Sequence, residues 1–431
     1  MILETIRHDL HSTSDPIQCM ALSALANIGG EELCTALVDD VKALVSSHVP
    51  MVRKKALLCM LRILRIKPKL VPVADFASPL LTLLDDKNLG VVMSVVSFIL
   101  GLVETNPEPF VAAVPHIILH LTRLAKNNAC TVDYLYYSTA NPWLQVKLLR
   151  LLQFFPIPAE ATHRSRLTEI LVKIITHTEV TKSVNKNNAD HSILFEAVNL
   201  IIKQGNDSDK SLRQQAVEML GRFLRVREPN IRYLGLSTMA RLAHLEGTGD
   251  AIRKHQEVVL GCLKEPDVSI RLRALDLIFA MCDSSNAMAI VEQLLVHVVT
   301  ADFRIKQEMM LKLAILAERH APNLNWYVDT ILQMISVGGD EVDDAVWHRV
   351  VQIVTNNEAL QVYATRKLYE SLAQPRPPSV VLKIASYLLG EFGMLLCGDD
   401  GALGVLLDVA LVFVPVMPSV VVLEGRLGSL F

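Results

Sequence analysis

Two histidines, His116 and His120, lie four residues apart in the segment HIILH, which is the spacing found in zinc-binding helices. The motif lacks the glutamate that would act as general base, because position 117 is Ile, and no third ligand is marked. Two histidines on the surface of a helix explain the segment better. We therefore predict no metal site and no other cofactor.

Paired acids are the second arrangement that could carry chemistry: Asp85 with Asp86, and Glu341 with Asp343 and Asp344. Both groups fall in predicted turns or at predicted helix starts, where the positive end of the helix dipole favours carboxylates. The sequence contains no phosphate-binding glycine loop, no GxSxG elbow and no kinase-type set. We predict no catalytic residue and a chain that is not an enzyme.

A basic cluster is the third arrangement. It places seven positive charges within 17 residues: Arg53, Lys54, Lys55, Arg62, Arg65, Lys67 and Lys69. Such a cluster could bind phosphoinositide headgroups or acidic peptides, with Arg53, Lys54 and Lys55 as the candidate lipid-binding residues. A solvated helix face, with Arg53 stacked along the turns of a repeat, explains it too. We favour this second explanation, because Arg53, Arg62 and Arg65 fall at about 0°, 180° and 120° around a helix.

Composition limits the class of protein. The chain has 431 residues, of which 51% are hydrophobic and only 5% aromatic, which suits aliphatic helix packing and excludes disorder and collagen. With 42 basic and 45 acidic side chains, no overall charge attracts nucleic acid or anionic lipid. Seven scattered cysteines without a CxxC pair, and an N-terminus without a signal-peptide pattern, predict a cytoplasmic chain.

A repeated pattern organises the sequence. A turn containing Asp, Asn or Pro is followed by an aliphatic residue and then by an Ala- and Leu-rich helix. Equivalent aliphatic residues lie 35 and 39 positions apart, first at Ile17, Val52 and Val91 and later at Ile231, Ile270 and Ile305. This period is typical of two-helix repeats. We predict an all-α fold, an α-solenoid of HEAT or armadillo-like helix pairs in a right-handed superhelix, with essentially no sheet.

Two segments depart from the pattern. Residues 176–191 are polar and rich in Asn and Lys, which predicts a surface loop between two repeat blocks within a trunk spanning residues 1–398. Residues 399–431 form an atypical apolar tail, in which Asp408 is the only charged residue from 402 to 423. Its length suits a membrane helix, but Asp408, Pro415 and Pro418 oppose one. A gene-model artefact, a solenoid helix and a membrane anchor all remain open.

Several stretches resemble a known family. They include PWLQVKLLRLLQ (142–153), ILFEAVNLII (193–202), NIRYLGLSTMARLA (230–243), ALDLIFAMCD (274–283), LKLAILAE (311–318), WYVDTIL (326–332) and YLLGEFG (387–393). Together they resemble the trunk of the large adaptins from about Leu3 to Gly398, and the alpha-adaptins more than the other branches. The N-terminal basic segment of that trunk, its second half, the hinge and the appendage are not represented.

The resemblance implies a scaffold subunit of the plasma-membrane clathrin adaptor, adaptor protein complex 2, which links cargo and membrane to clathrin in endocytosis. Its partners would be a beta-type large, a mu-type medium and a sigma-type small chain, with clathrin contacted indirectly. The full complex would bind phosphoinositide membranes at coated pits from the cytoplasm, and no nucleic acid. The alternative is a HEAT-repeat scaffold or transport receptor outside the adaptor family.

Overall fold

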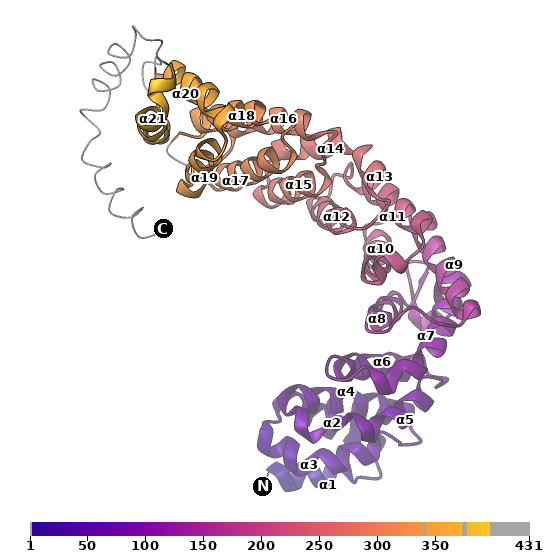
Figure 1. Ribbon diagram of the computed structural model, residues 1–431. Helices are drawn as coiled ribbons and strands as arrows, with labels where there is room; N and C mark the ends of the chain where they lie inside the picture. The colour runs from indigo at the N-terminus through magenta and orange to yellow at the C-terminus, as the bar shows by residue number, and fades with distance from the viewer. Residues whose placement is uncertain (1, 340–341, 373–376, 397–431) are drawn as a thin grey trace. The chain divides into compact units, whose positions relative to one another are not determined.

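The computed structural model describes residues 2–339, 342–372 and 377–396 (Figure 1). The described residues divide into two compact units. Unit 1 comprises Met1–Arg222 with His244–Ala251, and unit 2 comprises Phe223–Ala243 with the described residues from Ile252 onward. Helix α13 (Gly249–Arg253) falls where this division passes through the chain.

Unit 1 consists of two layers of helices that follow one another in pairs. In the figure labels its helices are α1 (Ile2–Leu10), α2 (Asp15–Ile28), α3 (Glu31–Leu44), α4 (Pro50–Ile66), α5 (Val73–Leu83), α6 (Leu89–Val103), α7 (Val114–Leu121), α8 (Pro142–Leu152), α9 (Ala161–His177), α10 (Val184–Gln204) and α11 (Lys210–Phe223). Helices α2, α4, α6, α8 and α10 pack side by side in one layer, and α3, α5, α7 and α9 lie in the other (Figure 1). The predicted helix pairs are thereby confirmed.

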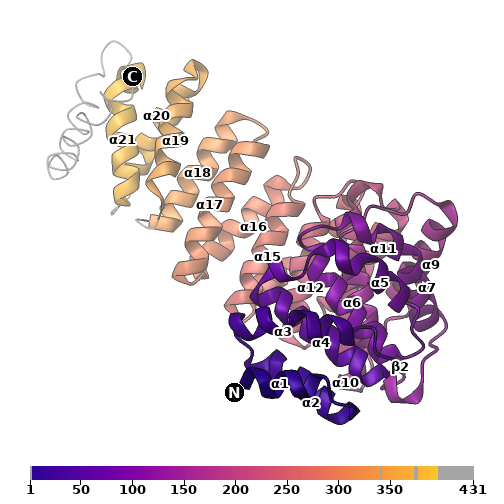
Figure 2. The same ribbon diagram turned by 90° about the horizontal axis from the view of Figure 1, so that it is seen from below.

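Unit 2 continues the same arrangement. Its helices are α12 (Pro229–Leu242), α14 (Gln256–Gly261), α15 (Val268–Met281), α16 (Ala287–Thr300), α17 (Phe303–His320), α18 (Leu324–Gly338), α19 (Asp344–Thr355), α20 (Glu358–Leu372) and α21 (Ser379–Phe392). Figure 2 shows α15 to α21 following one another side by side. Residues 379–396 are long and apolar enough to cross a membrane by length and composition alone, but α21 packs against α19 and α20.

The repeat pattern explains where the helices begin. Pro16, Pro50, Pro142 and Pro229 occupy the first turns of α2, α4, α8 and α12, where backbone N–H groups lack intrahelical partners. The aliphatic residue that follows is fully buried in α4, at Val52, and is 41% exposed in α2, at Ile17. Each helix then buries one face against the next pair, which is why the period is that of two helices.

The start of α6 allows the contribution of a helix cap to stability to be tested. Asn88 is its N-cap, and the side-chain oxygen Oδ1 accepts from the N–H groups of Gly90 (2.9 Å) and Val91 (3.3 Å). We expect Asn88→Ala to lower the free energy of unfolding by about 1 kcal/mol, because the N–H of Gly90 loses its acceptor, whereas that of Val91 keeps the Asn88 carbonyl oxygen (3.0 Å). Asn88→Ser should lose much less. Urea denaturation followed by circular dichroism measures both, and equal losses would contradict the capping role.

The predicted loop at residues 176–191 is wrong over most of its length. Helix α9 continues to His177, and α10 begins at Val184 with Ser183 as its N-cap. The first two turns of α10 have no apolar stripe, and local polar contacts hold them in place instead. Asn187 Oδ1 accepts from Thr181 N (2.8 Å), and Lys186 pairs with Asp190 one turn later (2.7 Å).

Two further sequence predictions concern small parts of the chain. Among the described residues the only sheet is an antiparallel pair of two-residue strands, β1 (Leu135–Tyr136) and β2 (Thr139–Ala140), so the prediction of essentially no sheet is confirmed apart from this hairpin. The apolar tail, residues 399–431, lies outside the described residues.

Candidate functional site

The two histidines do not form a metal site. His116 Nδ1 lies 3.1 Å from an Asp85 carboxylate oxygen on the surface, whereas His120 is buried and its Nε2 lies 2.8 Å from the carbonyl oxygen of Leu84. The prediction that both lie on the surface is therefore wrong for His120, which is buried on α7 against the end of α5. In the part of the chain that the structure describes, no group of three potential metal ligands occurs.

The buried His120 predicts a pH dependence. Burial is the main cause that lowers the pKa of this imidazole from 6.5. Below pH 6.5 the unfolded chain therefore binds a proton that the folded chain does not, so stability falls as the pH decreases toward the folded pKa. We expect the wild-type melting temperature to fall more between pH 7 and 5.5 than that of His120→Gln. Equal falls in the two proteins would exclude His120 as the cause.

The paired acids have structural partners. Asp343 caps α19 by accepting from Ala345 N (2.8 Å), and Asp344 accepts from Trp347 Nε1 (2.7 Å). Asp86 Oδ1 accepts from the N–H of Asn88 (2.7 Å) in the turn before α6. Glu341 lies outside the described residues. The prediction that these acids belong to turns and helix starts is confirmed for the described members.

Arg53 is not available to a ligand. Its guanidinium donates to the carbonyl of Ser47 (2.7 Å) and to Asp86 Oδ2 (2.6 Å), and both charged side chains are largely buried. The same kind of ion pair recurs in unit 2. There the fourth residue of α12, Arg232, pairs with Glu265, and the fourth residue of α15, Arg271, pairs with Asp302. The paired residues are 33, 33 and 31 positions apart, so each arginine joins one repeat to the turn of the next.

The rest of the basic cluster converges on one face of α4, contrary to the prediction from the arginines alone. At 100° per residue, Lys54, Lys55, Arg62 and Arg65 lie within about 100° of one another, and Arg53 points elsewhere. Arg62 and Arg65 are exposed, and Lys54 and Lys55 are half-buried. None of the four has an ion pair with a described residue. Positive charge on this face is thus uncompensated by the chain itself.

Helix α8, two places along the same layer, adds to that face. Lys147 Nζ donates to Ser97 Oγ of α6, the helix that packs between α4 and α8. Burial, helped by the positive charges of Arg150 and Arg65, lowers the pKa of Lys147. Arg150 is paired with Glu196 of α10. We call this the α4–α8 surface and define it by Met51, Leu58, Arg62 and Arg65 of α4 and Trp143, Lys147 and Arg150 of α8.

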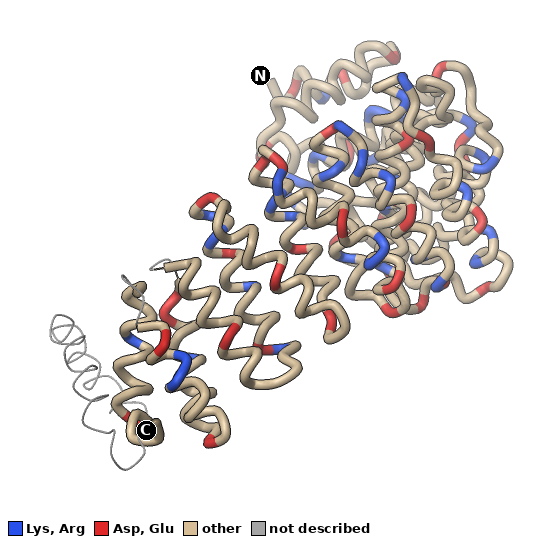
Figure 3. The backbone as a smooth tube through the Cα atoms, turned by 90° about the horizontal axis from the view of Figure 1, so that it is seen from above, with Lys and Arg blue, Asp and Glu red and all other residues tan. Residues whose placement is uncertain are grey.

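Apolar side chains accompany these charges. Met51, Leu58 and Trp143 of the α4–α8 surface are 54%, 37% and 52% exposed, and Met20 of the neighbouring α2 is 71% exposed. Large exposed apolar side chains beside unpaired cations are typical of a surface that another protein covers. Elsewhere acidic and basic positions are interspersed along the backbone (Figure 3).

The sequence contained part of this surface without revealing its extent. A helical projection that included the lysines would have gathered the α4 face, because the four residues share it. Nothing in the sequence joined Lys147 to Arg65, 82 positions earlier by number. That proximity depends on the packing of α4, α6 and α8 in one layer.

Comparison with known proteins identifies the family. Residues 1–421 match the family described as the Adaptin N terminal region. The chain belongs to this adaptin family. The resemblance to the large adaptins is confirmed, and because adaptins are adaptor subunits, so is the prediction that the chain is not an enzyme.

Curated adaptins similar to this chain include two proteins named AP-2 complex subunit alpha. The alpha-1 subunit of Arabidopsis thaliana is 46% identical over 403 residues, which are 93% of this chain and 40% of that protein. The alpha-2 subunit of Dictyostelium discoideum is 40% identical over 93% of this chain and 41% of its own length. A Dictyostelium AP-1 complex subunit gamma is less similar, at 32% identity. The chain spans about two fifths of the length of these alpha subunits.

Solved structures agree on the fold. A chain in a homology model of the full-length AP-3 complex in an intermediate open conformation is 19% identical, has a TM-score of 0.60, and is matched over 94% of this chain and 72% of its own. An engineered protein is matched over 96% of this chain with a TM-score of 0.53 and 16% identity. Because both identities are below 25%, these two matches show that this chain shares their fold and nothing further.

Proposed function

We propose that the chain is a scaffold subunit of a clathrin adaptor complex of the AP-2 type, linking cargo and membrane to clathrin during endocytosis. The support is its 46% and 40% identity to alpha subunits, higher than to the gamma subunit. Its partners are a beta-type large, a mu-type medium and a sigma-type small chain. Its place is the cytoplasmic side of the plasma membrane at clathrin-coated pits, where clathrin is contacted indirectly.

The α4–α8 surface is the observation that carries the scaffold role. It combines exposed apolar side chains with two arginines, Arg62 and Arg65, that have no ion pair with a described residue, which suits a protein partner whose contact surface is acidic at its edge. We assign this surface to the sigma-type small chain. A small folded subunit can cover several neighbouring helices of one layer.

Co-expression tests the proposal. The chain, carrying an affinity tag, is produced with a sigma-type and a beta-type chain of an AP-2 complex, and separately with the corresponding chains of an AP-1 complex. We expect the AP-2 chains to co-purify in stoichiometric amount and the AP-1 chains much less. Recovery of the chain alone in both cases would overturn the proposal and favour a HEAT-repeat scaffold outside adaptor complexes.

Membrane binding is proposed only for the assembled complex. Arg53 is occupied by Asp86, so of the three candidate lipid-binding residues only Lys54 and Lys55 present free charge. In sedimentation at physiological salt, we expect the chain to bind phosphoinositide liposomes no better than other anionic liposomes of equal charge. Selective binding that Lys54→Ala with Lys55→Ala abolishes would show that α4 recognises lipid directly.

A further inference from the structure

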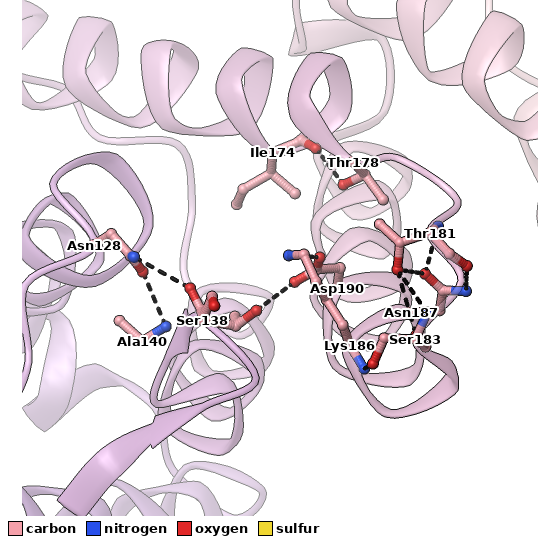
Figure 4. Close-up of polar contacts among 11 residues, drawn as sticks. Asn128, Ser138, Ala140, Ile174, Thr178, Thr181, Ser183, Lys186, Asn187 and Asp190 are labelled. Atoms are coloured by element: carbon pink, nitrogen blue, oxygen red, sulfur yellow. Dashed lines mark hydrogen bonds and ion pairs between the residues drawn. The ribbon is translucent and has the colours of Figure 1, made fainter. Parts of the chain in front are cut away.

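A small polar pocket lies beside the β1–β2 hairpin of unit 1. It has a volume of about 240 Å³ and is lined by residues from the π-helical turn Thr122–Lys126, the β1–β2 hairpin, α8, the last turn of α9 and the first turns of α10. Figure 4 shows the hairpin on one side, Asp190 and Lys186 of α10 on the other, and Ile174 and Thr178 of α9 above them.

One wall of the pocket is made of strained backbone. Among the described residues the only non-glycine residues with positive φ are Asn128 (49°), Tyr137 (45°), Ser138 (69°) and Asn141 (38°), and all belong to this segment. The Asn128 side chain holds the hairpin from both sides: Oδ1 accepts from Ala140 N (3.0 Å), and Nδ2 donates to Ser138 O (3.2 Å). Strain that surrounding contacts maintain in this way is characteristic of ligand-binding sites.

The acceptors around the pocket already have donors. Asp190 is the only acid that lines it, and its two oxygens accept from Thr139 Oγ1 and Lys186 Nζ, each at 2.7 Å. The carbonyl oxygen of Ile174 accepts from Thr178 Oγ1 (2.6 Å). The carbonyl of Ala140 accepts from Gln145 Nε2 (2.7 Å). The one carboxylate of the pocket is therefore already occupied by two donors.

The side chains that line the pocket can still donate hydrogen bonds. Lys173 donates to the carbonyl of Lys126, and Lys186 donates to Asp190, so each ammonium group keeps further N–H groups. His177, on the last turn of α9, lines the same pocket and is exposed. Once Lys186 has compensated Asp190, the ammonium group of Lys173 remains as excess positive charge, and the exposed ring of His177 adds a further nitrogen to the lining. The pocket is thus complementary to a compact anion that only accepts hydrogen bonds.

We propose that this pocket binds a phosphate monoester. A phosphate group offers three acceptor oxygens and up to two negative charges, which matches Lys173, Lys186 and His177 better than a single carboxylate does. The volume is below that of pockets that enclose whole cofactors. The pocket therefore takes the phosphate group itself, carried by either a phosphorylated protein side chain or a small soluble ester.

Calorimetric titration of the full chain tests this. The probes are inorganic phosphate, a capped Gly-Gly-phosphoserine-Gly-Gly peptide and the same peptide with serine, all in Hepes buffer at constant ionic strength. We expect Lys173→Ala and His177→Gln to weaken phosphate binding, the former at least about tenfold, because an N–H donor to a charged acceptor is lost. Lys182→Ala removes an exposed charge nearby that does not line the pocket, and should leave the affinity within about twofold.

The outcomes separate the sources of the phosphate. Tighter binding of the phosphopeptide than of inorganic phosphate assigns the pocket to a phosphorylated protein segment. Equal binding of both assigns it to small esters. Absence of binding, or equal binding by wild type and Lys173→Ala when circular dichroism shows both folded, would overturn the proposal.

Discussion

Replacing Arg62 and Arg65 by glutamate is expected to weaken binding of the sigma-type small chain by roughly thirtyfold or more, about 2 kcal/mol. Both arginines are exposed on one stripe of α4 and have no ion pair with a described residue, so the free chain loses nothing that holds its own fold together. An acidic partner edge that meets two carboxylates instead of two guanidinium groups is repelled. The same change should slow association and reverse its salt dependence.

The comparison variant for this experiment is Lys69→Glu with Lys182→Glu. Both lysines are exposed and lie outside the α4–α8 surface, so the net charge of the chain changes equally. Surface plasmon resonance on the co-expressed and then separated chains gives both affinities, and thermal melting shows whether each variant is folded. If the two variants bind the small chain equally, the effect is one of net charge and the assigned surface is wrong.

Helix pairs were predictable here because the signal repeats. Val52 and Val91 each lie in the first turn of a helix and are fully buried, so an error at one repeat is corrected by the next, although the equivalent Ile17 is 41% exposed. The start of α10 was not predictable in this way. Its first turns are held by Thr181, Asn187 and the Lys186–Asp190 pair, and local polar contacts of this kind leave no hydrophobic periodicity.

The sequence also predicted little of the sites that several helices build together. The face of α4 was contained in its own sequence, whereas its neighbour α8 could be added only from the packing of three helices. The polar pocket was harder to predict from the sequence. Asn128 and Ser138 adopt positive φ without being glycine, and the sequence carries no mark of that conformation. Sites assembled from several short turns depend on tertiary contacts that composition and spacing do not encode.

Removing Arg53 is expected to destabilise unit 1 by about 3 kcal/mol. Its partner Asp86 is only 9% exposed in its side chain, and Arg53→Ala would leave that carboxylate buried without its counter-charge. Hydrogen exchange in α4 and α6 should increase together, because the pair joins the repeat that contains α4 to the turn before α6. Lys54→Ala, one residue further along the same helix, should change stability by no more than about 0.5 kcal/mol.

A double variant separates the loss of the pair from the loss of side-chain packing. Arg53→Met keeps an extended apolar stem, and Asp86→Asn removes the buried charge but keeps an oxygen that accepts from the N–H of Asn88, as Asp86 Oδ1 does at 2.7 Å. Neutralising both partners of a buried pair is often tolerated, whereas removing one is not. We therefore expect the double variant to recover most of the stability that Arg53→Met alone loses, measured as a coupling energy from urea denaturation of the four proteins. Additive losses would mean that Arg53 acts through its contact with Ser47 and its packing, and that the ion pair between repeats contributes little.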